Sequence, residues 1–175
     1  MAALLVASLP VSADISVSSG SVSERDGAYY LDAGLDVELT PVARNALREG
    51  VPLVIAVRLR VVRLRSWWPW DAAMVESERR YRLRYSALAE RYRLTDLAAR
   101  EHRSFASLRE MLSAFDDLPP LRAISAGLLE SGQRYQVRLR AVLDLDSLPR
   151  PMRTLAYISP GWWLASDWYA WRLAP

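Results

Sequence analysis

Apolar and charged residues alternate with a period of two along several stretches of this chain. From Tyr29 to Leu39 the odd-numbered positions are apolar or aromatic, whereas the even-numbered ones include Asp32, Asp36 and Glu38. A strand places these two sets on opposite faces, while a helix would scatter the carboxylates around its circumference. This segment is therefore predicted to be a strand with one buried and one hydrated face.

The longest such stretch runs from Leu53 to Leu64, and its alternation changes phase near Val61 and Val62. One extra residue in a strand reverses which face each later side chain occupies, so this shift predicts a long strand bent by a β-bulge. Alternation with arginine, or weaker alternation, predicts further strands at residues 15–22, 80–85, 91–94, 121–128, 135–145 and 168–173. Residues 86–90 are short enough to close a hairpin between two of them.

Two short helices are predicted between the strands. Thr40 can cap the first, with Pro41 at its first position and Gly50 just past its end, while Ser107 and Glu110 form a capping box for the second. Several strands, two short helices and no regular alternation of strand and helix predict a mostly β fold. We expect an antiparallel β-sandwich or a strongly curved sheet.

The N-terminal residues resemble an export signal. An apolar run from Ala2 to Leu9 is followed by Val11-Ser12-Ala13, which offers small residues where a signal peptidase cleaves. No basic residue precedes the run, and a buried N-terminal strand is the alternative. We expect residues 1–13 to be a signal peptide, short enough to be the truncated remainder of a longer one. Residues 14–175 should form a single β-rich domain, periplasmic or otherwise exported.

The composition argues against several functional classes. The sequence has no cysteine, which excludes disulfides, thiolate zinc sites and cysteine nucleophiles. A formal net charge of +3 is too small to imply a nucleic-acid partner. After residue 13 no stretch approaches the roughly 20 apolar residues that span a bilayer, so the mature chain is not expected to cross a membrane.

Catalysis is not expected either. His102 is the only histidine, so the sequence has no histidine cluster for a metal, and we expect His102 to be an exposed loop or cap residue. Carboxylate pairs such as Asp116-Asp117 exist, but the sequence does not place a pair across a cleft. We predict no catalytic residues, no metal site and no cofactor.

The chain resembles the exported proteobacterial family called domain of unknown function 4390. The resemblance lies in Thr40-Pro41, Gly50-Val51-Pro52-Leu53, Trp68-Pro69-Trp70, Tyr81-Arg82-Leu83-Arg84-Tyr85, Tyr92-Arg93, Ser104-Phe105 and the run from Trp163 to Trp171. It covers nearly all of the expected mature chain. The resemblance implies export and a gene often placed beside a membrane-bound sensor kinase of the nitrogen-regulation type, and it supplies no catalytic residues.

Tryptophans are the first candidates for a binding surface. They form two groups in the sequence, one directly after the 53–64 strand and one near the C-terminus. The residues are Trp67, Trp68 and Trp70, and Trp162, Trp163, Trp168 and Trp171. One interpretation is that both groups meet as a small core closing one end of a sandwich. The other is a recognition surface, for which tryptophan and arginine are favoured residues. The candidate surface residues are Trp67, Trp68, Trp70, Trp163 and Trp168.

Arginine rows are the second candidate, with Arg82 and Arg84 as the selected residues. If the strand with Asp32, Asp36 and Glu38 is their neighbour, cross-strand ion pairs explain the rows. The alternative is an anionic ligand held by guanidinium forks.

Taken together, these patterns predict an exported binding or accessory module without catalysis. The partner suggested by the resemblance is a membrane-bound, envelope-sensing histidine kinase. The alternative is a domain that binds a glycan or an anionic envelope ligand through its tryptophan loops and arginine rows.

Overall fold

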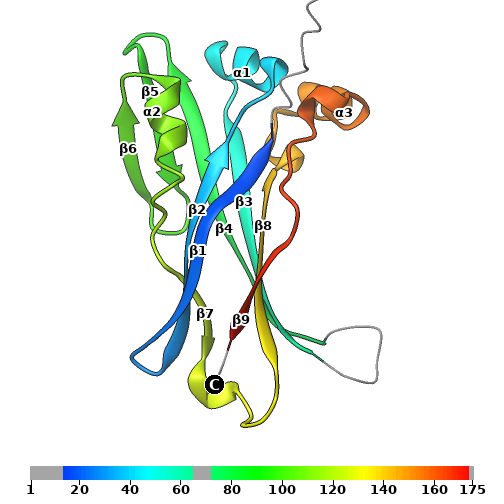
Figure 1. Ribbon diagram of the computed structural model, residues 1–175. Coiled ribbons are helices and arrows are strands. Elements are labelled where there is room, and N and C mark those ends of the chain that lie inside the picture. Colours follow the sequence, from blue (N-terminus) through cyan, green and yellow to red (C-terminus); the bar gives the residue numbers. More distant parts are fainter. Residues whose placement is uncertain (1–13, 65–71, 174–175) are drawn as a thin grey trace, which may run out of the picture.

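The computed structural model describes residues 14–64 and 72–173, which form two antiparallel sheets facing each other (Figure 1). The smaller sheet has the strand order β1-β2-β7, and the larger has the order β6-β5-β4-β3-β8-β9. The strands are β1 (Ile15–Arg25), β2 (Ala28–Val37), β3 (Leu53–Arg63), β4 (Ala72–Ser86), β5 (Arg91–Asp96), β6 (Glu101–Phe105), β7 (Leu121–Ser125), β8 (Tyr135–Leu143) and β9 (Tyr169–Leu173). The predicted mostly β sandwich is confirmed.

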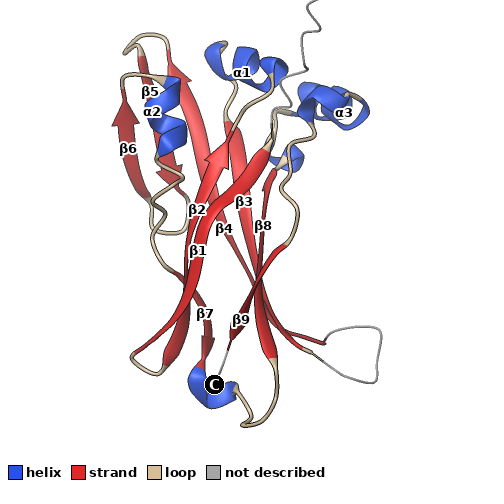
Figure 2. Cartoon of the chain, viewed as in Figure 1, coloured by secondary structure: helices blue, strands red, loops and turns tan. Residues whose placement is uncertain are grey.

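Short helices lie mainly at the two ends of the sandwich (Figure 2). They are α1 (Pro41–Arg48), α2 (Leu108–Ser113) and α3 (Arg150–Ile158), with 3₁₀ turns η1 (Ala126–Leu128), η2 (Leu145–Ser147) and η3 (Pro160–Trp162). The hydroxyl of Thr40 accepts a hydrogen bond from the N–H of Ala43 at 3.1 Å, and that of Ser107 accepts one from Glu110 at 3.2 Å. The caps thus start α1 and α2 as predicted, whereas α3 was not predicted.

Strand β3 is the centre of the larger sheet, between β4 and β8. Its inward side chains, which include Leu53, Ile55 and Val57, are completely or almost completely buried. The register with β4 shifts between Val61 and Val62, so the sheet is irregular at the predicted place. The extra residue is Met74 of β4, however, and β3 pairs with β8 without a shift, so the insertion predicted within β3 itself is wrong. Strand β3 therefore buries an aliphatic row against the smaller sheet and exposes Arg58 and Arg60 on its opposite face.

The core between the sheets contains the buried row of β2, as the alternation predicts. Leu31 and Leu35 are buried, and Phe115, just after α2, meets the ring of Tyr81 edge to face at 5.5 Å. The N–H of Leu35 donates to the carbonyl of Phe115 at 2.9 Å. This bond and the ring contact fix the loop after α2 between the two sheets.

Strand β6 departs from the expectation for His102. The residue lies on this edge strand, paired with Thr95 of β5, and not in a loop or cap, although it is exposed as expected. Residues Glu101 to Ser104 are all exposed. An edge strand without a buried row has no period-two apolar signal, so the polar residues around His102 resemble a loop in the sequence.

The buried hydroxyl of Tyr81 leads to a pH-dependent prediction. It has no hydrogen-bond partner among the described residues, and burial raises the pKa of Tyr81 to about 12. In the unfolded chain the phenol of Tyr81 would ionise near pH 10. The preference of the folded state for the neutral phenol therefore contributes fully to stability below pH 10. This contribution is lost as the pH rises towards 12, by up to about 3 kcal/mol.

We therefore expect Tyr81→Phe to be at least as stable as the wild type at pH 7 and to lose less stability above pH 10. Removing a buried hydroxyl without a partner spares a desolvation cost of about 1–3 kcal/mol. Urea unfolding of both proteins between pH 7 and 11 measures this. A variant that is less stable at pH 7 would contradict the absence of a partner.

Candidate functional site

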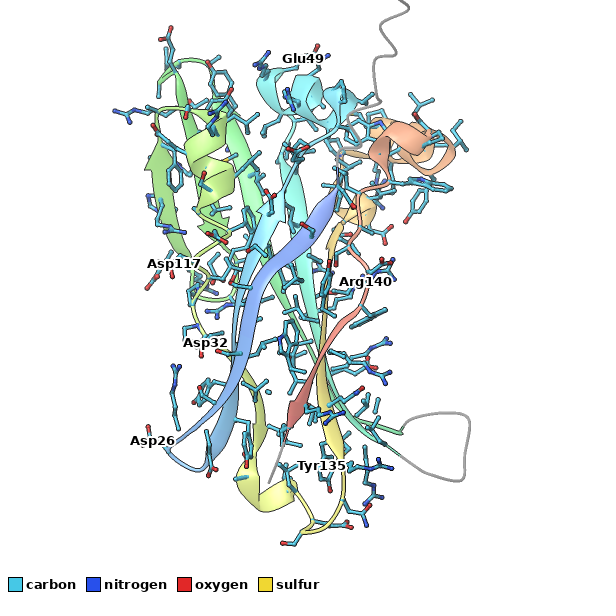
Figure 3. All side chains as sticks on the ribbon, viewed as in Figure 1. Asp26, Asp32, Glu49, Asp117, Tyr135 and Arg140 are labelled. Carbon is cyan, nitrogen blue, oxygen red and sulfur yellow. The ribbon has the colours of Figure 1, made fainter. Side chains whose placement is uncertain are left out.

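The outer face of the larger sheet is rich in arginine. The cross-strand register places Arg58, Arg60, Arg80, Arg82, Arg84, Arg93, Arg138, Arg140 and Arg172 on this face. Figure 3 shows Arg140 projecting from β8 on the side away from the smaller sheet. The carboxylates that the described residues place here are Glu76, Glu78 and Asp144. The face is therefore more positive than the net charge of +3 would suggest.

Several of these arginines have carboxylate partners within the sheet. Arg58 pairs with Glu78 and Arg60 with Glu76, each at 2.9 Å, and Arg80 also contacts Glu78. The hydrogen bonds that Arg58 and Arg80 donate hold the pKa of Glu78 below its ordinary value. These pairs are largely exposed, so each contributes about 0–1 kcal/mol.

The predicted partners of the arginine rows are wrong. Asp32 and Asp36 lie in β2 and Glu38 directly follows it. This strand belongs to the smaller sheet and does not neighbour the arginine strands. Asp32 instead pairs with Arg25 of β1 at 2.7 Å. Figure 3 shows Asp32 on the side of the smaller sheet, away from Arg140. Alternation fixes which side chains share a face, but it does not fix which strands are neighbours.

Arg82 and Arg84, the two arginines selected from the sequence, lie together on the outer face of β4. They line a cavity of about 320 Å³ with Gly50, Pro52, Val54 and Ser147. Neither guanidinium has a hydrogen bond or an ion pair with another described residue. Arg84 also lies directly opposite Arg93 of β5, which likewise lacks such a partner. Like charges in directly opposite positions destabilise a sheet.

Of the tryptophan candidates, the structure describes Trp163 and Trp168. Trp67, Trp68 and Trp70 lie outside the described residues. Trp163 is 64% exposed, directly after the buried Trp162.

The other C-terminal tryptophans lie along the larger sheet and not beside Trp163. Trp168 is 36% exposed, with the guanidinium carbon of Arg60 at 4.8 Å from its ring centroid. Trp171, on β9, packs against Gly20 of β1, where an added Cβ would lie 2.3 Å from the indole. The described C-terminal tryptophans therefore do not form one cluster.

Exposed apolar side chains gather at the end of the molecule that carries α1 and α3. We call the set Val42, Leu155, Tyr157, Ile158 and Trp163 the apolar end. The turn η3 contacts both helices, and Val42 lies 3.0 Å from the position of a Cβ at Gly161. Figure 1 shows α1 and α3 at the same end of the sandwich.

Sequence reasoning missed most of the apolar end because it missed α3. The residue that caps α3 is Pro149, which makes no side-chain cap hydrogen bond, so no capping residue in the sequence marks the start of this helix. The spacing of Leu155 and Ile158, three positions apart, was the available signal. Of the apolar end, the sequence predicts only Trp163 as a surface residue.

Within residues 14–64 and 72–173, no three histidine or carboxylate side chains gather as a metal site. None of the described helices has the length and apolar character needed to cross a bilayer.

Comparison with known proteins gives one family. The model of the family described as Domain of unknown function (DUF4390) matches residues 12–172. Comparisons with curated proteins and with solved structures gave no significant match. Because the family match covers nearly the whole sequence, the chain belongs to this family.

Proposed function

We propose that this member of the DUF4390 family is an exported, non-catalytic binding module that docks onto another envelope protein through its apolar end. The observation that carries the proposal is the exposure of large apolar side chains there. Ile158 is 75%, Trp163 64% and Leu155 62% exposed. Single exposed apolar residues are ordinary, but a group of them at one end is typical of an interaction surface.

The apolar end is also well supported from beneath. Ala156 and Trp162 are buried under it and belong to the main core. The hydroxyl of Tyr157 donates to Asp146 at 2.7 Å, which orients its ring, and this bond raises the pKa of Tyr157. A surface held in place in this way loses little conformational entropy on binding. Aromatic residues such as Trp163 and Tyr157 are favoured as central contacts in protein interfaces.

The partner we propose is a membrane-bound sensor kinase of the envelope. The family resemblance supports this choice, since its genes often neighbour such a kinase, and the expected signal peptide would deliver the chain to the same compartment. The apolar character of the surface supports a protein in preference to a glycan.

We expect Leu155→Asp to abolish or strongly reduce recovery of membrane proteins with the tagged mature chain. A charge in the centre of an apolar contact would be buried without a partner, which costs several kcal/mol. The measurement is crosslinking in intact cells, followed by purification of the tag and identification of the membrane partners by mass spectrometry.

The matched control is Leu128→Asp. Leu128 is 60% exposed, against 62% for Leu155, but it lies in η1 at the opposite end of the sandwich. This variant should retain the partners of the wild type. If both variants recover the same proteins as the wild type, the apolar end is not the docking surface. If no sensor kinase is recovered with any of the three proteins, the proposed partner is wrong.

A further inference from the structure

We infer that Arg82, Arg84 and Arg93 form a binding site for a phosphoryl group, with the neighbouring cavity taking the organic part of a phosphate ester. This site lies on the outer face of the larger sheet. It is distinct from the apolar end and does not depend on the protein partner proposed above.

The first argument is the uncompensated charge. On the same face, Arg58, Arg60 and Arg80 have carboxylates within ion-pair distance. Arg82, Arg84 and Arg93 have none among the described residues. The arginines near Glu76 and Glu78 of β4 are therefore neutralised by ion pairs, whereas those where β4 pairs with β5 are not.

The second argument is the register. Arg84 and Arg93 are directly opposite each other, and Arg82 lies two residues before Arg84 on the same face. Positions two apart in a strand are about 7 Å apart, so the three guanidinium groups can converge on one anion. A phosphoryl group with several oxygens can accept paired hydrogen bonds from more than one guanidinium, and its charge would relieve the repulsion between Arg84 and Arg93.

The third argument is the cavity beside these side chains. Its lining combines Arg82 and Arg84 with the apolar residues Val54 and Pro52, the backbone of Gly50 and the hydroxyl-bearing Ser147. A volume of about 320 Å³ accommodates a small organic group. A phosphate ester would therefore place its charge between the arginines and its organic part against Val54 and Pro52.

Asp144 and Asp146, which precede the lining residue Ser147 in the chain, form no ion pair with Arg82 or Arg84. Asp144 is buried, and its Oδ2 lies 3.6 Å from Nη1 of Arg80, while its Oδ1 accepts from the N–H of Asp146. Asp146 in turn accepts from Tyr157. The ion-pair partner of Asp144 is therefore Arg80, and the hydroxyl of Tyr157 bonds to Asp146.

The test compares two double variants that remove the same charge at the same spacing. Arg82→Gln with Arg84→Gln removes two of the three arginines of the proposed site. Arg58→Gln with Arg60→Gln removes two arginines of β3 that have carboxylate partners. Glycerol 3-phosphate is titrated at constant ionic strength and followed by amide chemical shifts. In parallel, binding to vesicles of phosphatidylglycerol and phosphatidylcholine is compared with binding to vesicles of phosphatidylcholine alone.

We expect the Arg82/Arg84 variant to bind at least about tenfold more weakly than the wild type, since charged hydrogen bonds contribute about 1.5–3 kcal/mol each, and the Arg58/Arg60 variant to bind nearly normally. Binding of glycerol 3-phosphate identifies a soluble ester as the source, and binding to anionic vesicles alone identifies a lipid headgroup. The inference is overturned if neither probe binds, or if both double variants weaken binding equally. In the latter case the attraction belongs to the whole face and not to this site.

Discussion

Replacing Phe115 with alanine is expected to lower the free energy of unfolding by about 3–5 kcal/mol, as for other fully buried aromatic side chains. Phe115 is completely buried and meets Tyr81 edge to face, so the substitution removes both apolar burial and an oriented ring contact. Domains of this size are typically stable by about 5–15 kcal/mol, so the variant should approach the limit of folding. Chemical denaturation at neutral pH measures the loss.

Phe105→Ala is the matched comparison. Phe105 is only partly buried, at the end of the edge strand β6, where it lies beside the guanidinium of Arg103. We expect it to lose clearly less stability than Phe115→Ala. Equal losses would mean that the loop after α2 is not the tie between the two sheets that its contacts indicate.

The parts of the fold that the sequence predicts are those with a local chemical signal. The phase change at Val61 and Val62 predicts where the ladder is irregular, because a strand has only two faces and a change between them is visible in one stretch of chain. It does not show which strand carries the extra residue, which is Met74 of β4. Thr40 and Ser107 predict helix starts because a capping hydroxyl acts within three residues.

The parts that it does not predict lack such a signal or depend on distant residues. The strand β6 has only exposed polar side chains over most of its length, and α3 begins without a capping hydroxyl. Strand order is set by contacts between segments far apart in the chain. The carboxylates of β2 therefore could not be assigned to the correct sheet from alternation alone.

The candidate sites divide in the same way. The exposure of Arg82 and Arg84 on one face follows from period-two spacing, and the sequence predicts it. Their lack of partners, and the cavity beside them, depend on β5 and on the turn η2 far along the chain. Trp162 is buried and Trp163 is exposed because of how η3 packs against α1 and α3. Two neighbouring tryptophans in a sequence carry no signal of which one is buried.

Gly34→Ala is expected to destabilise the protein by about 1–3 kcal/mol, because it adds an atom where none fits. A Cβ at this buried position of β2 would lie 2.8 Å from the backbone carbonyl oxygen of Asp116 and 2.7 Å from its carboxylate. That carboxylate also accepts a hydrogen bond from Ser18 at 2.6 Å, so the loop has little freedom to withdraw. Glycine is needed here for close approach of the loop to the sheet and not for a left-handed backbone.

Gly127→Ala is the control, since a Cβ there meets no atom within 4 Å. It should be neutral or slightly stabilising, because alanine reduces the entropy of the unfolded chain. The double variant with Gly34→Ala and Phe115→Ala gives the sharper test. Both changes act on the same contact between β2 and the loop after α2. The double variant should therefore lose less unfolding free energy than the sum of the two single variants. Strict additivity in urea unfolding would show that the loop packs against β2 and against Tyr81 independently.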